Sequence, residues 1–250
     1  MIRTAVIGLA GLALIVAGCN GDPPSATTTA ADGSKGSAAA TKAPAFTDSQ
    51  LATALLTTTD LGGTWKVAPK STATPKTSPS PAAAATPQSD TGCAYLDRLI
   101  KNSDKGGADD FGGGAGPEVN FTVDTFGPFL FQKVSASGEA DAKKLISLLS
   151  GLASNCKTFQ SVDENGTATE FRVERIDLKK AGDDTVGLRL TGATPPTLLG
   201  SLTVEFSMIT VRRGQLLSTL AWIGINTKPD PAFLQKLTDT SAEKLNTVKR

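Results

Sequence analysis

The feature that most constrains the fold is a run of alternating apolar residues that begins near position 202. Apolar side chains stand at every second position from Leu202 to Met208, which is typical of a β-strand with one buried face. The phase reverses at Ile209, and this reversal predicts a β-bulge. Arg213-Gly214 then predicts a turn into a second strand over 216–225. A strand pair of this length needs a larger sheet and a covering layer.

Other segments are expected to form the remaining strands of the sheet and the helices that cover it. Alternation over 119–123 and 129–134, around Gly127-Pro128, predicts a hairpin, and Asn165-Gly166 predicts a second hairpin. Further strands are expected over 158–162, 169–178 and 185–191. Three- and four-residue apolar spacing predicts helices that begin near Thr47 and over 93–101, 139–153 and 231–248. We therefore expect an α+β fold, with a twisted antiparallel β-sheet and helices packed mainly on one face.

The N-terminus predicts export and a lipid anchor. Arg3 precedes an uncharged run over 5–17, which is too short to span a bilayer core of roughly 30 Å. Val16-Ala17-Gly18-Cys19 resembles the lipobox of bacterial lipoproteins. The resemblance implies removal of residues 1–18 as a signal peptide, a lipid on Cys19 and attachment to the cell membrane. The alternative is an ordinary secretory peptide with a chance cysteine.

Composition divides the remaining chain. Residues 19–45 are mostly Thr, Ala, Pro, Ser and Gly, a composition that predicts a disordered tether. Residues 46–250 suffice for one α+β domain. A second low-complexity stretch, 68–92, is interpreted as a long loop within this domain. It could instead be a further part of the tether, with the fold proper beginning at Cys93.

Cysteine and histidine counts bound the chemistry. The chain has three cysteines and no histidine. If Cys19 carries lipid, Cys93 and Cys156 remain, and a pair of cysteines in an exported protein predicts a disulfide. Two buried free thiols are the alternative. The lack of histidine excludes Ser-His-Asp and Cys-His catalysis and histidine metal sites.

Charge and acidic residues give no sign of a nucleic-acid partner or a cofactor. The formal net charge is +1, without the basic cluster that nucleic-acid binding needs. Asp104, Asp109 and Asp110 lack the spacing and glutamate of a calcium loop, so no metal is expected. The expected partners are the membrane, through the lipid on Cys19, and a small envelope ligand or an envelope protein.

Several short motifs together resemble a known group of exported proteins. They are Asp60-Leu61 with Trp65, Cys93, the segment 156–159, the segment 211–214 and the helix over 233–245. The combination resembles actinobacterial exported lipoproteins that are similar to the PknH-like extracellular sensor domain of mycobacterial receptor kinases. The resemblance implies an α+β domain with a ligand-sensing cleft. The chain departs from that pattern because the kinase sensors carry two disulfides, and because it contains no kinase domain.

The expected function is a non-catalytic ligand-binding or sensing domain at the cell envelope. Candidate residues for an apolar cleft are the aromatic side chains Trp65, Phe129, Phe131 and Trp222. One alternative is an envelope hydrolase that uses a carboxylate pair, for which Asp183-Asp184 and Asp163-Glu164 are the candidates. Another is a structural or assembly lipoprotein without a pocket.

Overall fold

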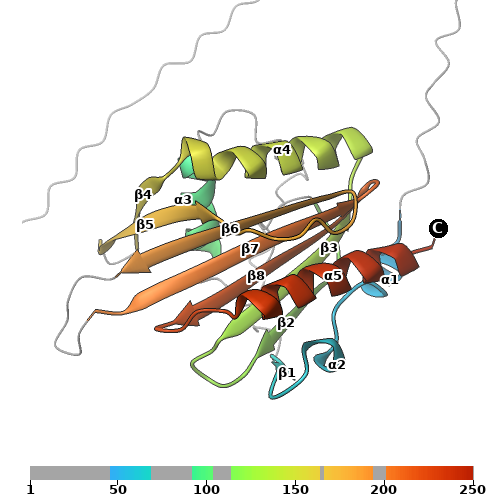
Figure 1. Ribbon diagram of the computed structural model, residues 1–250, viewed down its shortest axis with the longest axis horizontal. Coiled ribbons are helices and arrows are strands. Elements are labelled where there is room, and N and C mark those ends of the chain that lie inside the picture. Colours follow the sequence, from blue (N-terminus) through green and yellow to red (C-terminus); the bar gives the residue numbers. More distant parts are fainter. Residues whose placement is uncertain (1–45, 69–91, 104–113, 164–165, 194–200, 250) are drawn as a thin grey trace, which may run out of the picture. The chain divides into compact units, whose positions relative to one another are not determined.

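A computed structural model describes residues 46–68, 92–103, 114–163, 166–193 and 201–249. In these ranges eight strands form one antiparallel sheet in the order β1-β2-β3-β8-β7-β6-β5-β4 (Figure 1). The strands are β1 (Lys66–Val67), β2 (Glu118–Thr122), β3 (Phe129–Ala136), β4 (Thr158–Val162), β5 (Ala168–Arg175), β6 (Asp184–Ala193), β7 (Thr203–Arg213) and β8 (Leu216–Ile225). The predicted α+β class with an antiparallel sheet is confirmed.

The central strand β7 is buried on both sides. Phe206 and Met208 belong to one apolar cluster, whereas Ile209 and Val211 belong to another. Neighbouring residues of a strand project to opposite faces of the sheet, so this pattern places one cluster on each face. The register between β7 and β6 runs without interruption from Ala193↔Thr203 to Asp184↔Arg212. The predicted bulge at Ile209 is therefore wrong, because the phase reversal records burial on both faces.

The helices divide between these two faces. They are α1 (Asp48–Ala52), α2 (Thr58–Leu61), α3 (Gly92–Ser103), α4 (Glu139–Asn155) and α5 (Pro231–Thr247). Buried residues of α3 and α4 pack in the cluster that contains Phe206, and those of α1, α2 and α5 pack in the cluster that contains Ile209. We call these sides of the sheet the α4 face and the α5 face. The expectation of helices mainly on one face is thus corrected to cover on both.

Local sequence explains where α5 begins and which side of α4 is buried. Asp230 accepts a hydrogen bond from the backbone N–H of Ala232 and caps α5, which has Pro231 in its first turn. In α4 the expected residues are buried, at the spacing that puts them on one side of the helix: Ala142, Leu145, Ile146, Leu149 and Leu152. None of the described helices is both long enough and apolar enough to cross a bilayer.

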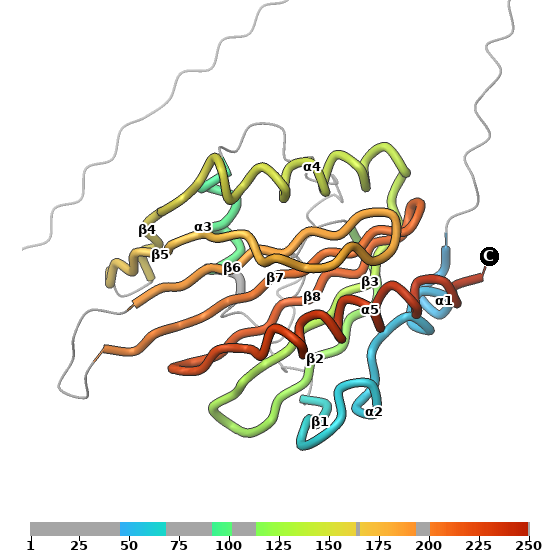
Figure 2. Tube along the Cα trace, viewed as in Figure 1, coloured from blue at the N-terminus to red at the C-terminus, as the bar shows by residue number. Residues whose placement is uncertain are grey.

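Residues 46–68 form a strap across the α5 face, beside α5 (Figure 2). The predicted helix start near Thr47 is confirmed, with a capping box between Thr47 and Gln50. A second box, between Thr57 and Asp60, starts the short helix α2. Both boxes satisfy backbone N–H groups that would otherwise lack partners at the helix starts.

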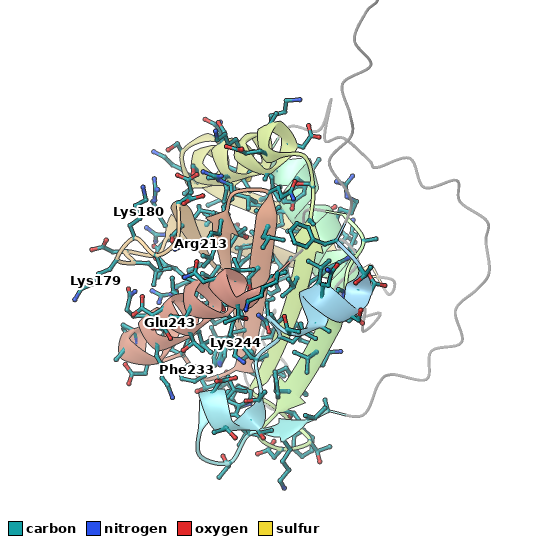
Figure 3. The ribbon with its side chains drawn as sticks, turned by 90° about the vertical axis from the view of Figure 1, so that its right-hand side faces the viewer. Lys179, Lys180, Arg213, Phe233, Glu243 and Lys244 are labelled. Atoms are coloured by element: carbon teal, nitrogen blue, oxygen red, sulfur yellow. A yellow bond between two sulfur atoms is a disulfide. The ribbon has the colours of Figure 1, made fainter. Side chains whose placement is uncertain are left out.

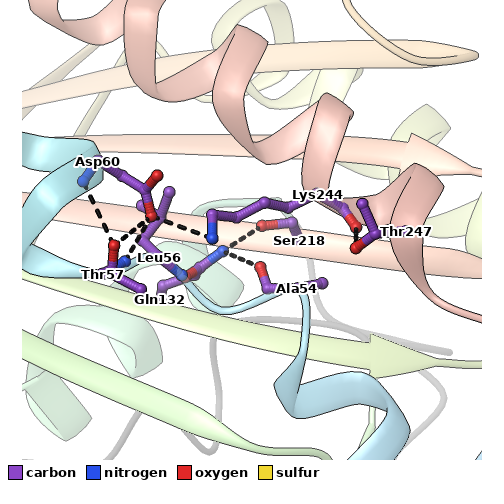
Figure 4. Close-up of polar contacts among 8 residues, drawn as sticks. All are labelled: Ala54, Leu56, Thr57, Asp60, Gln132, Ser218, Lys244 and Thr247. Atoms are coloured by element: carbon purple, nitrogen blue, oxygen red, sulfur yellow. Dashed lines mark hydrogen bonds and ion pairs between the residues drawn. The ribbon is translucent and has the colours of Figure 1, made fainter.

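Polar contacts attach this strap to the sheet, where they are buried, and to α5, where they are partly exposed (Figure 4). The side chain of Gln132, on β3, accepts a hydrogen bond from the backbone N–H of Leu56 at 2.6 Å. Its amide nitrogen donates to the carbonyl of Ala54 at 3.3 Å and to Ser218 at 3.0 Å. Lys244, on α5, lies 3.0 Å from the carboxylate of Asp60. The strap is therefore fixed by directional bonds as well as by apolar packing.

Candidate functional site

The cysteines fall into two groups. Cys93 in α3 and Cys156 after α4 form a disulfide, with their Cα atoms 5.3 Å apart. The predicted pairing is confirmed, and it joins the two helices of the α4 face. Cys19, the predicted signal peptide 1–18 and the predicted tether 19–45 lie outside the described residues, as does 69–91 of the predicted loop 68–92.

The four aromatic candidates do not all share one face of the sheet. Trp65 stacks on Phe233 of α5, with ring centroids 5.8 Å apart and an interplanar angle of 6°. Trp222 is buried in the core of the α5 face. Phe131 packs against the cluster of the α4 face, and Phe129, two residues earlier on β3, projects to the same side. A single cleft lined by all four is not formed.

The acidic pair Asp183-Asp184 is engaged in the structure of a turn. Arg212, at the end of β7, lies 2.6 Å from the carboxylate of Asp184. The backbone N–H of Gly214 donates to Asp183 at 2.6 Å, and this hydrogen bond together with Arg212 holds the pKa of Asp183 below its usual value. Both carboxylates are thus committed to the β7–β8 turn. In the second candidate pair, Glu164 lies outside the described residues.

An open groove of about 680 Å³ runs between the first turns of α5 and the segment 176–180 that follows β5. Its volume falls within the range of roughly 300–1,000 Å³ that is usual for small-ligand sites. The residues that line it come from these two elements alone: Asp177, Leu178, Lys179, Pro231, Ala232, Gln235, Lys236, Asp239, Thr240 and Glu243. Figure 3 shows Lys179 on the segment and Glu243 on α5, on the same side of the molecule.

Gln235 fixes the two walls of the groove to each other. Its side-chain oxygen accepts a hydrogen bond from the backbone N–H of Lys179 at 2.8 Å. Its nitrogen donates to the Lys179 carbonyl at 3.4 Å and to Asp239 at 2.9 Å. One side chain therefore satisfies both backbone groups of Lys179 and joins the two walls, so the groove exists before any ligand arrives.

Close packing also holds the segment against the sheet. A Cβ atom at Gly187, on β6, would lie 2.7 Å from the side chain of Leu178 and 3.0 Å from that of Ile176. Only glycine allows the segment to approach β6 this closely. A smaller hollow of about 330 Å³ lies on the other side of the segment and shares Asp177 and Leu178 with the groove.

The walls of the groove carry charges of both signs. Lys179 and Lys236 supply ammonium groups, and Asp177, Asp239 and Glu243 supply carboxylates. The carboxylates are spread over the two walls and do not form a metal site. Across the described part of the chain, no group of three histidine, cysteine or acidic side chains could hold a metal ion.

Beyond this groove, the α5 face contains a buried ion pair with unmet hydrogen-bonding capacity. The side chain of Glu205, on β7, is 1% exposed, and its Oε1 lies 3.1 Å from Nε of Arg189, which is 28% exposed. The orientation does not make a hydrogen bond, and among the described residues neither carboxylate oxygen nor Oγ of Ser207 has a hydrogen-bond partner. Such groups raise the free energy of the folded state unless water reaches them.

No pattern in the sequence predicts the groove. Lys179-Lys180 has the appearance of an ordinary solvated pair, and Gln235 that of a surface helical residue. The only local hint is that Gln235 and Asp239 are four residues apart and therefore share one side of α5. The pairing of the 176–180 segment with α5 depends on tertiary structure.

Comparisons with known proteins find a similarity among solved structures only. No protein-family model matches the sequence, and no curated protein matches it. Among solved structures, the crystal structure of the extracellular domain of PknH from Mycobacterium tuberculosis is similar, with a TM-score of 0.46 and 10% sequence identity. The match covers 81% of this chain and 98% of that chain. These values are too low to transfer a family or a function.

Proposed function

We propose that this chain is a lipid-anchored, extracytoplasmic domain that binds a small polar ligand of the cell envelope without catalysing a reaction. The observation that carries the proposal is the Cys93–Cys156 disulfide. Disulfides persist in oxidising compartments, which fits a chain exported by its N-terminal segment. The bond also uses two of the three cysteines, so Cys19 is left for the lipid.

The groove beside α5 is the proposed binding site. Ammonium and carboxylate groups on its walls suit a ligand that carries both charges, such as an amino acid or a short wall peptide. Because Gln235 holds the walls together, ligand binding would not have to order them first, which favours affinity. An envelope protein with a charged peptide segment is the alternative occupant.

The anchor is tested by the Cys19→Ala variant of the full chain. We expect the wild-type chain to incorporate a labelled fatty acid in cells and to sediment with membranes. The variant is expected to lose the label. Equal labelling of both chains would contradict the proposed anchor, whatever the groove binds.

The groove is tested by reversing its charge. The Lys236→Glu variant is expected to weaken or abolish the thermal shift produced by short wall peptides with a free amine and carboxylate. The matched control is Lys143→Glu, a reversal on the exposed side of α4 where the lysine makes only an ion pair with Glu139. No shift in the wild-type chain with any such peptide, or an equal shift in all three proteins, would remove this site.

A further inference from the structure

The hairpin that joins β2 to β3 presents an aromatic side chain to solvent. Phe126 is 83% exposed, the highest fraction among the large hydrophobic residues in the described ranges. A single exposed apolar residue usually needs no explanation. The exposure of Phe126 is explained here by the local structure of the hairpin and by the neighbouring residues.

Phe126 is held out by an ordered tip. The carboxylate of Asp124 accepts a hydrogen bond from the backbone N–H of Phe126 at 2.7 Å, and the Asp124 carbonyl accepts one from Gly127 at 3.4 Å. The hydroxyl of Thr122 also donates to that carbonyl. The tip thus satisfies much of its own backbone, which lowers the cost of moving it into a less polar medium.

Two more exposed apolar residues lie at the same end of the sheet. The pairing of Phe129 with Ile223 sets the hairpin tip beside the end of β8, where Ile225 is 45% exposed. Ile225 pairs in turn with Val204, so Leu202, which is 41% exposed, lies at the start of the adjacent strand. Consecutive strand ends therefore present Phe126, Ile225 and Leu202 along one end of the sheet.

We propose that this end of the domain docks on the phospholipid bilayer, with Phe126 inserted at the interface. The inference rests on the proposed lipid anchor, which would keep the domain close to a membrane. A chain as long as residues 20–45 can extend up to roughly 90 Å, so the tether permits the contact. The lipid would supply the attachment, and apolar side chains such as Phe and Leu bury readily at the boundary between headgroups and acyl chains.

The charges at this end favour insertion over electrostatic attraction. Lys66, on β1, pairs in register with Thr122, close to Asp124 of the hairpin loop, and Lys228 lies in the same loop as Asp230 after β8. These cations and anions balance. Docking is therefore expected on uncharged phosphatidylcholine as well as on anionic vesicles, with little dependence on salt.

The experiment uses the full lipidated chain reconstituted in phosphatidylcholine vesicles, with an environment-sensitive fluorophore on Thr125→Cys. The native cysteines are occupied by the disulfide and the lipid, so the new thiol is unique. We expect a blue-shifted emission and quenching by brominated lipids. A label on Asp141→Cys, in the first turn of α4 at the other end of β3, is expected to show neither.

Adding Phe126→Ser to the Thr125→Cys chain separates insertion from simple proximity. The expected result is loss of the quenching, with an unchanged unfolding midpoint because Phe126 is exposed. Quenching that persists in this variant, or that is absent in a chain shown by mass to carry lipid, overturns the docking proposal alone. If the mass shows no lipid, the proposed anchor fails, and docking is tested by adding the same labelled chain to vesicles, where absent quenching overturns it.

Discussion

The two faces of the sheet are stabilised in different ways. On the α4 face, α3 and α4 pack apolar side chains on the strands and are joined covalently by Cys93–Cys156. On the α5 face, the strap and α5 also bury apolar residues, but they enclose Gln132, Glu205 and the Asp60–Lys244 contact. Buried polar groups stabilise a fold only while every partner is present. The α5 face should therefore be the more sensitive to single polar substitutions.

The largest expected effect concerns the α4 face. In the Cys93→Ser, Cys156→Ser double variant, loss of a cross-link that spans 63 residues should lower the free energy of unfolding by about 4 kcal/mol. Urea unfolding, followed by circular dichroism, measures the change. A midpoint equal to that of the wild-type chain would show that helix packing alone secures this face.

On the α5 face, Arg189→Ala should cost about 3 kcal/mol, because it leaves the Glu205 carboxylate buried without its counter-charge. The double variant Arg189→Leu, Glu205→Leu removes both charges and should lie within about 1 kcal/mol of the wild-type chain. Chemical unfolding of the wild-type chain, the single variants Arg189→Leu and Glu205→Leu, and the double variant gives the coupling. If the double variant is as unstable as Arg189→Ala, the pair contributes net stability.

Gln132→Leu tests the attachment of the strap. The substitution leaves the buried N–H of Leu56 without an acceptor, and we expect a loss of about 2 kcal/mol. Hydrogen exchange should also speed up in residues 54–61 before it does in β3. The control is Gln160→Leu, on the exposed side of β4, for which little change is expected.

The smallest effect is a pH dependence from Asp60. Burial raises the pKa of Asp60. Hydrogen bonds from the side chain and backbone of Thr57, together with Lys244, lower it by more than burial raises it, so the net shift is downward. The resulting stabilisation is present above an unfolded pKa of about 3.9 and is lost as pH falls through the folded value. Asp60→Asn should flatten the stability profile below about pH 5 by less than 1 kcal/mol. An unchanged profile, with Asp48→Asn as the control, would contradict this role.

Sequence patterns predicted the elements better than their arrangement. Apolar periodicity predicted α4 and the strands β2 and β3. The number of cysteines predicted the disulfide. The bulge was wrongly predicted because a strand buried on both faces loses the alternation by which a face is recognised, as at Met208 and Ile209. The helices on two faces were missed for the same reason.

The candidate site was less predictable than the fold. Trp65 and Trp222 lie on the α5 face and Phe131 lies on the α4 face. Successive side chains of a β-strand project to opposite faces of the sheet whatever their residue type. The groove arises where the segment that follows β5 meets α5. Its key residue, Gln235, has no sequence feature that distinguishes it from a solvated helical glutamine.

The position of the strap in the chain has a mechanical consequence. If Cys19 is anchored as proposed, any pull between the membrane and a bound partner enters the folded domain through residues 46–68. Its first hydrogen bonds to the sheet are those between Gln132 and the backbone of Ala54 and Leu56, and the Asp60–Lys244 contact then joins it to α5. These few bonds would rupture in sequence, while the central strands share the load over whole ladders. Under tension, the strap would therefore detach before the strands of the sheet separate.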